Sequence, residues 1–307
     1  MGLMKHQNAL QWLIPPIFIL ALLAALAGMW PGDGQPYPLT TFRGEEVTVN
    51  ARGLYYWDTV SSAAQMQAND LVMLTLGLPL LAISFWLAQR GSLRGRLLLA
   101  GVLGFILYTY VTMCFGAHYN ALFLVYVALF SLSLFAFVLV MMSFDLAALP
   151  AHFSKKLPRR AIAGLLFFTA GFLALAWSGR ILPTLAPLSL GEKGGVQGVP
   201  MLENTTSMFI QAMDLALIAP LCVLAGVLLL RRRPWGYLLA AVGLTKFLTM
   251  GVAVSLMGLN MARVGAAVSP VELILFPSLT LLNLFLALGL LRSVRPQNWS
   301  PDHSPTT

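Results

Sequence analysis

Charged residues are scarce in this chain of 307 residues. Asp, Glu, Lys and Arg make up 10% of the sequence and hydrophobic residues 58%, whereas an ordinary soluble domain carries roughly 25% charged residues. This scarcity excludes a water-soluble globular protein. A mean hydropathy of +0.80 also excludes an intrinsically disordered chain, which needs low hydrophobicity and high net charge. The composition therefore places the protein in a lipid bilayer.

Residues that bind metals or carry out redox chemistry are also few. The chain has four histidines and two cysteines, and Cys114 and Cys222 lie in different apolar segments without a C-x-x-C motif. It lacks the G-x-x-x-x-G-K-[ST], G-x-S-x-G and H-E-x-x-H motifs of P-loop NTPases, α/β-hydrolases and zinc proteases. We therefore predict no metal site and no cofactor, and the sequence favours a role other than catalysis.

Eight long apolar segments occur between the polar breaks of the sequence. A helix needs about 20 mainly apolar residues to cross a hydrocarbon core about 30 Å thick, where it satisfies its own backbone hydrogen bonds. We predict an all-α, polytopic integral membrane protein with about eight transmembrane helices, in which residues 1–307 form a single membrane domain. The predicted spans lie near residues 9–29, 70–89, 96–116, 120–144, 161–183, 206–230, 235–257 and 270–292.

Basic residues gather on every second connection between these segments. Cytoplasmic loops of membrane proteins carry an excess of Lys and Arg, so we assign these connections to the cytoplasm. They hold Lys5, Arg90, Arg94, Arg96, Lys155, Lys156, Arg159, Arg160, Arg231, Arg232, Arg233, Arg292 and Arg295. We therefore expect a plasma membrane protein, of the bacterial inner membrane, with both termini in the cytoplasm. This orientation and contact with anionic membrane lipids explain the formal net charge of +8 without a nucleic-acid partner.

The first apolar segment allows an alternative to a transmembrane helix. Lys5, an apolar run and the sequence Ala25-Leu26-Ala27 together resemble a signal peptide with an A-x-A cleavage site. The apolar run is longer than the roughly 7–15 residues usual in signal peptides, which favours a retained helix. Cleavage would leave seven spans and an outer N-terminus.

Three polar intervals are predicted to lie outside the spans. Residues 30–69 form the longest one, an extracytoplasmic loop, and the β-branched residues within 40–49 predict a short hairpin or an edge strand. Residues 184–205 are rich in glycine and predict a flexible outer loop. Residues 296–307 are polar and predict a disordered cytoplasmic tail.

The end of the first outer loop carries signals for an anchor and a helix. Residues 54–57, Leu-Tyr-Tyr-Trp, are typical of an interfacial aromatic anchor. Asp58 or Thr59 is predicted to cap a short helix that runs through Ala68 and leads into the second span.

Two parts of the sequence resemble each other when Pro79 is aligned with Pro220. Without a gap, the same shift, which we call the repeat offset, aligns Arg90 with Arg231 and Gly95 with Gly236. We predict a 4 + 4 duplication with halves 1–150 and 151–295. Four spans return the chain to its starting side, so the halves would be related by an axis along the membrane normal. Chance similarity between two Leu-rich helices is the alternative.

Two charged residues lie deep inside apolar segments and not near their ends, at a depth where a charge costs roughly 2.5–3.5 kcal/mol on insertion scales. Asp214 lies in the sixth segment and Lys246 in the seventh, and a rise of about 1.5 Å per residue gives them similar depths. We predict an intramembrane ion pair that either couples to a substrate or proton or simply holds two helices together. Phe105 aligns with Lys246 in the first half, so this site would belong to one half only.

A second group of polar residues is predicted at the outer ends of the spans. One interpretation is an outward-facing polar cavity that deepens towards Asp214 and Lys246, in which Arg180 binds an anionic group and Asp70 or Glu272 binds a cation or proton. The other is an aromatic belt with charged helix caps. The group comprises Asp58, Asp70, Tyr108, Tyr110, Thr112, His118, Tyr119, Asn120, Arg180 and Glu272.

Three functions are compatible with these features. The favoured one is the binding or transport of a small solute or lipid-like molecule through the outer cavity. A non-catalytic membrane subunit or assembly factor would instead bind a protein partner through residues 30–69. An enzyme acting on a lipid-linked substrate at the outer surface would use Asp58, Asp70 or His118 as acid or base.

Overall fold

The computed structural model describes residues 5–42, 44–182 and 202–295. Within these ranges the chain is mostly helical, and eight helices are long and apolar enough to cross a membrane, which confirms the prediction at this level. The predicted loop 184–205 lies largely, and the predicted tail 296–307 wholly, outside the described ranges. The eight helices are α1 (Gln7–Met29), Val60–Gln89, α4 (Leu93–Gly116), α5 (Phe123–Met142), α6 (Arg159–Ile181), Phe209–Leu230, α9 (Pro234–Arg263) and α10 (Pro270–Ser293).

The outer surface of the helical bundle is apolar. Large side chains point away from the bundle on several helices, and Leu124, Leu175 and Ile274 are 76%, 77% and 71% exposed. Soluble proteins rarely expose extended apolar patches. This surface therefore fits contact with lipid chains.

The second span is one continuous helix that contains a π-helical turn. α2 (Val60–Val72) continues through the turn Met73–Gly77 into α3 (Leu78–Gln89). The short helix predicted to run through Ala68 does not end there. No glycine or proline interrupts residues 68–73, so the helix continues. The C-terminal part of the interval 30–69, from Val60 onwards, belongs to this helix and not to a loop.

The sixth span has the same construction. α7 (Phe209–Met213) continues through the π-helical turn Asp214–Ile218 into α8 (Ala219–Leu230). In both spans a proline, Pro79 or Pro220, is the second residue after the π-helical turn. Proline has no N–H to donate, and its ring crowds the preceding turn of a helix. The wider π-helical turn before each proline accommodates this ring.

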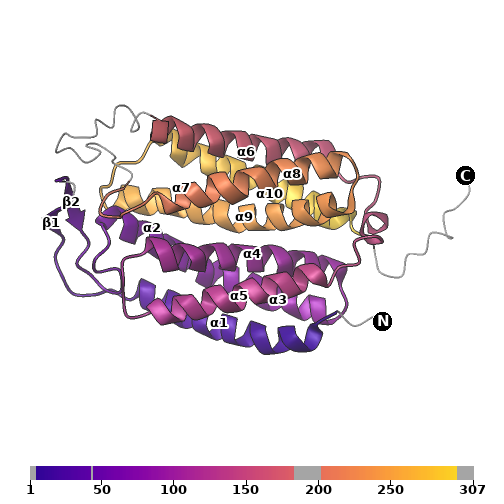
Figure 1. Ribbon diagram of the computed structural model, residues 1–307, viewed down its shortest axis with the longest axis horizontal. Coiled ribbons are helices and arrows are strands. Elements are labelled where there is room, and N and C mark those ends of the chain that lie inside the picture. Colours follow the sequence, from indigo (N-terminus) through magenta and orange to yellow (C-terminus); the bar gives the residue numbers. More distant parts are fainter. Residues whose placement is uncertain (1–4, 43, 183–201, 296–307) are drawn as a thin grey trace, which may run out of the picture.

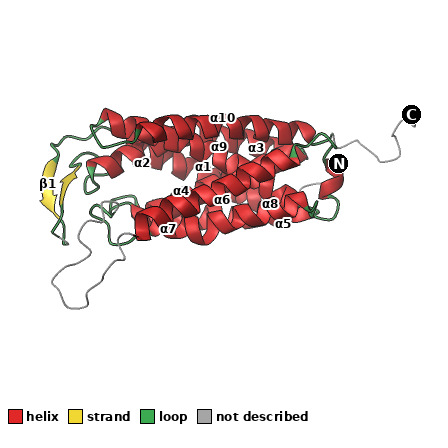
Figure 2. Cartoon of the chain, turned by 90° about the horizontal axis from the view of Figure 1, so that it is seen from above, coloured by secondary structure: helices red, strands yellow, loops and turns green. Residues whose placement is uncertain are grey.

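The predicted hairpin lies at one end of the bundle (Figures 1 and 2). β1 (Tyr37–Thr40) pairs antiparallel with β2 (Glu46–Val49). A single bridge between Val49 and Thr59 connects the hairpin to the start of α2. Of the two predicted caps, it is the Thr59 side chain that accepts a hydrogen bond from the Ser62 N–H, at 3.1 Å.

α1 begins and α10 ends at the opposite end of the bundle, as an even number of spans requires (Figure 1). There the short 3₁₀ helix Leu149–His152 contacts the end of α10: Phe153 and Val294 form a β-bridge, and the Arg295 N–H donates to the His152 carbonyl at 2.8 Å. That this end faces the cytoplasm stays a prediction.

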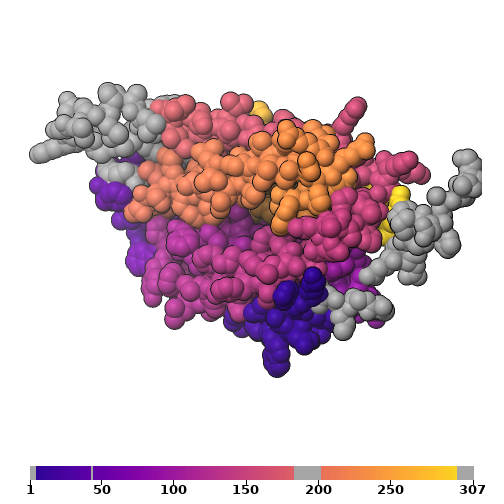
Figure 3. All heavy atoms as spheres, turned by 45° about the vertical axis from the view of Figure 1, so that its right-hand side comes forward, coloured from indigo at the N-terminus to yellow at the C-terminus, as the bar shows by residue number. Residues whose placement is uncertain are grey.

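The first four spans lie side by side in one half of the bundle and the last four in the other (Figure 1), and the two halves pack closely (Figure 3). α4 and α9 meet at the centre. A Cβ atom on Gly101 would collide with Thr245, and one on Gly104 would lie 3.7 Å from Val242. The repeat offset relates Gly101 to Val242 and Gly104 to Thr245, so these two contacts are equivalent under it.

Candidate functional site

Asp214 is bound by two hydrogen-bond donors inside the bundle. The Tyr108 hydroxyl on α4 donates to Oδ1 at 2.9 Å, and the Trp177 indole N–H on α6 donates to Oδ2 at 3.0 Å. Asp214 is 7% exposed, so these donors take the place of water around the carboxylate. Three spans therefore meet at this one side chain.

Lys246 approaches the same site from α9. It is 8% exposed, and its Nζ lies 3.9 Å from the centre of the Tyr108 ring and 5.0 Å from that of Phe247. Both distances are within the roughly 6 Å of a cation–π interaction.

Tyr108 separates the amine from the carboxylate. Its ring contacts Lys246 while its hydroxyl binds Asp214. No salt bridge of 4.0 Å or less joins Asp214 to Lys246, both of which the structure describes. The predicted ion pair is therefore indirect in this structure, and its coupling role stays a prediction.

Polar groups continue from Trp177 to the surface of the bundle. The Arg180 guanidinium lies 5.7 Å from the Trp177 ring, and its Nη2 is 2.9 Å from Glu272 Oε1. These two residues were predicted as separate contacts for an anionic and a cationic group, and the structure pairs them with each other. Both side chains are more than a third exposed, so the ion pair contributes only about 0–1 kcal/mol.

Asp70 belongs to a different cluster. The Tyr55 hydroxyl donates to Asp70 Oδ2 at 2.6 Å, and both residues are buried. The rings of Tyr110 and Tyr126 stack with centres 6.2 Å apart. Burial, with a further contribution from Asp70, raises the pKa of Tyr55 well above 10.0, so its hydroxyl keeps its proton and donates.

Asp58 and His118 form a pair at the end of the bundle that carries the hairpin. His118 Nδ1 is 3.1 Å from Asp58 Oδ1, and the His118 backbone N–H donates to the same oxygen at 3.3 Å. Asp58 is 1% exposed, whereas the His118 side chain is 27% exposed. The hydrogen bond with Asp58 raises the pKa of His118 above 6.5, although burial acts in the opposite direction. Asn120 supports this turn by donating to the His118 carbonyl at 3.2 Å.

We expect His118 to titrate above the pKa of a free histidine. Because its folded-state pKa is raised, its protonated ring stabilises the fold fully below pH 6.5, and this contribution is lost as the pH rises through the folded-state pKa. Asp58→Asn removes the charged acceptor and is expected to lower the pKa of His118. NMR titration of the His118 ring protons, assigned with His118→Gln, measures both values. Equal pKa values in the two proteins would contradict the pair.

The sequence does not single out Trp177, and it suggests a different role for Tyr55. Trp177 precedes Arg180 by three residues, a spacing that places two residues on the same face of a helix, and this was the available signal. Tyr55 was assigned to the interfacial anchor, which is wrong because the residue is buried against Asp70. Tyr56 and Trp57 are exposed, as an anchor requires.

The eight long apolar helices are compatible with a multi-pass helical membrane protein, and ionisable side chains are buried among them. Among the residues that the structure describes, no three His, Cys, Asp or Glu side chains come together as metal ligands. Comparison of the chain with protein-family models, with curated proteins and with solved structures finds no match. The site is therefore interpreted from its own geometry.

Proposed function

We propose that this protein binds and transports a small polar solute or the polar part of a lipid-like molecule, and that Asp214, Tyr108 and Lys246 lie on its path. The observation that carries the proposal is the burial of an acid and an amine on two sides of one tyrosine, inside membrane-spanning helices. Ionisable residues within spans are costly, and they mark substrate, ion or proton pathways.

The corresponding position in the N-terminal half supports a functional role for these charges. Under the repeat offset, Asp214, Lys246 and Tyr108 correspond to Met73, Phe105 and Thr249. Met73 and Phe105 are almost fully buried, and a Cβ atom on Gly77 would lie 2.9 Å from the Met73 sulfur and 3.2 Å from the Phe105 ring. Apolar side chains therefore fill this position. Apolar replacements for buried ion pairs are often neutral or stabilising, so the fold does not need an acid and an amine here.

Backbone geometry supports the 4 + 4 duplication as part of the proposal. The repeat offset places the first residue of the π-helical turn Met73–Gly77 on the first residue of the turn Asp214–Ile218. Gly91 and Arg232, related by the same offset, both have positive φ, at 81° and 56°. A parallel repeat has its axis along the membrane normal, and here that axis would pass between α4 and α9. These helices carry Tyr108 and Lys246, so rocking of the two halves would change the surroundings of the site.

The π-helical turn gives the sixth span a place to bend. Asp214 is the first residue of the turn, and its carbonyl accepts the hydrogen bond of the Ala219 N–H. Pro220, which follows directly, cannot donate a backbone hydrogen bond. Single π-helical turns are frequent at functional sites. Bending here would move the Asp214 carboxylate relative to Tyr108.

Thiol labelling tests whether water reaches the site. In a background with Cys114→Ala and Cys222→Ala, Gln211→Cys places a thiol three residues before Asp214, on the same side of the helix. We expect this thiol to react with a charged, membrane-impermeant reagent added outside the cell, because a transport path must be hydrated.

The controls for this labelling are two positions of known exposure. Leu224→Cys, on the apolar outer surface of α8, is expected to stay unreactive, and Tyr56→Cys, near the hairpin, is expected to react. Inertness of the thiol at position 211 together with reaction at position 56 would contradict the transport proposal.

An enzyme acting on a lipid-linked substrate is the second candidate, and the Asp58–His118 pair favours it. A partly exposed histidine bonded to a buried carboxylate is suited to exchange protons with a substrate. The titration described above also tests this candidate. If His118 kept one protonation state across the neutral pH range, it would be unable to act as acid and base.

A further inference from the structure

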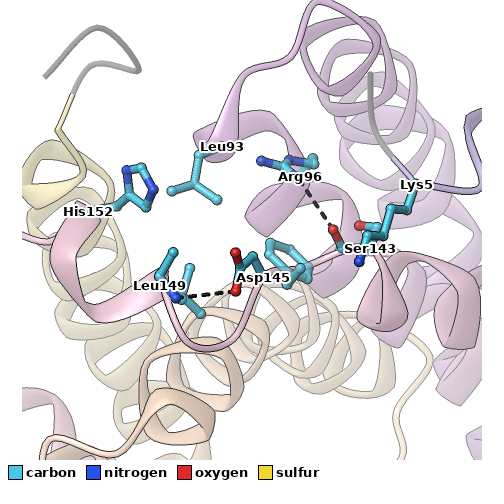
Figure 4. Close-up of a pocket in the computed structure, with 9 residues that line it drawn as sticks. Lys5, Leu93, Arg96, Ser143, Asp145, Leu149 and His152 are labelled. Carbon is cyan, nitrogen blue, oxygen red and sulfur yellow. Dashed lines mark hydrogen bonds between the residues drawn. The ribbon is translucent and has the colours of Figure 1, made fainter. Parts of the chain in front are cut away.

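A cavity of about 230 Å³ lies at the end of the bundle opposite to the hairpin. Its polar lining residues come from four separate segments (Figure 4). Lys5 precedes α1, Arg96 lies in the first turn of α4, and Ser143 and Asp145 follow α5. His152 ends the 3₁₀ helix. The cavity is distant from the Asp58–His118 pair, and it shares no residue with the site around Asp214.

The lining of this cavity has an excess of positive charge. Lys5, Arg96 and His152 supply cationic or protonatable groups, and Asp145 is the one acid among the lining residues. Asp145 Oδ1 accepts the backbone N–H groups of residues 147 and 148, at 3.1 and 3.3 Å, so it is engaged in its own turn. None of the three basic side chains forms an ion pair with a carboxylate in the described part of the chain.

Arg96 has hydrogen-bonding capacity that the protein leaves unused. Its Nη1 donates to the Ser143 carbonyl at 3.4 Å, whereas its Nε is buried and has no acceptor. A buried donor without an acceptor is unfavourable. The planar guanidinium matches the oxygens of a phosphate, to which it can donate two parallel hydrogen bonds.

We propose that this cavity binds a phosphate group, with Arg96 as its main contact and Lys5 as a second cation. The phosphate belongs either to the headgroup of an anionic lipid or to a soluble phosphate compound. A volume of about 230 Å³ is smaller than the roughly 300–1,000 Å³ of pockets for drug-sized ligands, so it suits a headgroup or a small anion. Leu93, Phe144 and Leu149 provide an apolar wall beside the charges.

Thermal unfolding of the full-length protein in nanodiscs tests this proposal. Three conditions are compared: phosphatidylcholine alone, phosphatidylcholine with a minority of phosphatidylglycerol, and phosphatidylcholine with inorganic phosphate against sodium chloride of equal ionic strength. We expect Tm to rise in the second or the third condition. A rise with phosphatidylglycerol alone identifies a lipid headgroup, and a rise with inorganic phosphate identifies a soluble phosphate.

Variants test whether the rise in Tm comes from binding in the cavity. Arg96→Gln is expected to weaken binding about tenfold or more, and Lys5→Gln to weaken it less. Arg292→Gln removes one positive charge at the same end of the bundle but outside the cavity, and should bind as the wild type does. If Arg96→Gln does not fold, Arg96→Lys and Lys5→Gln replace it, and weaker binding than in the wild type is expected for both. No rise of Tm in either condition, or an equal loss in Arg292→Gln, would overturn the proposal.

Discussion

Lys246→Met is expected to lower the free energy of unfolding by about 3 kcal/mol. This substitution removes the Lys246 amine and leaves the Asp214 carboxylate as a buried charge without a nearby cation. For a directly bonded pair, such a loss costs roughly 3–5 kcal/mol. We expect the lower end of this range because Tyr108 separates the two groups. Asp214→Asn is expected to have a comparable effect, since it leaves the amine of Lys246 without a carboxylate nearby.

The double variant separates this electrostatic coupling from the loss of packing. With both charges removed, no buried charge is left uncompensated, so the destabilisation should be smaller than the sum of the single effects by about 0.5–3 kcal/mol. Denaturant unfolding in detergent micelles measures all three variants. Lys156→Met, on an exposed turn, is the matched control and should change stability by less than about 0.5 kcal/mol. Additive losses would contradict the coupling.

The sequence was sufficient to locate Asp214 and Lys246 but not to find what connects them. A charge within an apolar segment is a clear signal, and the helical rise translates residue number into depth. Tyr108 and Trp177 carry no such signal, because aromatic residues within spans fit lipid contact, an interfacial belt or the core equally well. Which way Tyr108 points depends on how α4 packs against α9, and this is decided by contacts between distant parts of the chain.

The same reason explains why the sequence did not indicate which of the predicted outer polar residues contact one another. Residue number indicates the level of a side chain along the membrane normal but not its rotation about the helix axis. Asp58 binds His118, Asp70 binds Tyr55, and Arg180 binds Glu272. Whether a cavity joins these clusters during a functional cycle stays a prediction.

Two errors in the predicted helix boundaries share one cause. The second span begins at Val60 and not near residue 70, and α9 continues past residue 257 to Arg263. These extensions contact each other, because α2 packs against α9 and the Asn260 side chain donates to the Ala64 carbonyl at 2.7 Å. Tertiary contacts therefore sustain helix in sequence that is too polar to be recognised as a span from hydropathy alone.

Gly236→Ala and Gly95→Ala are expected to destabilise the protein by similar amounts, about 1–3 kcal/mol each. A Cβ atom on Gly95 would lie 2.7 Å from the backbone nitrogen of Ala88, and one on Gly236 would collide with the backbone of Leu229. Backbone atoms cannot move aside by a change of rotamer, so α3 and α4, or α8 and α9, would have to separate.

Gly164→Ala provides the control for these two variants, because nothing lies within 4 Å of a Cβ atom at Gly164 on α6. Replacing a helical glycine by alanine normally stabilises by roughly 0.5–1 kcal/mol, so this variant should change stability in the opposite direction, as measured by unfolding in denaturant. That difference in sign separates helix propensity from close packing. If Gly95→Ala destabilised the protein and Gly236→Ala did not, the two helix turns would not be equivalent in energy, which would count against the proposed duplication. Equal losses of stability at both positions would show that the two helix turns are equivalent in energy as well as in backbone geometry. Chance similarity between two Leu-rich helices does not predict this result.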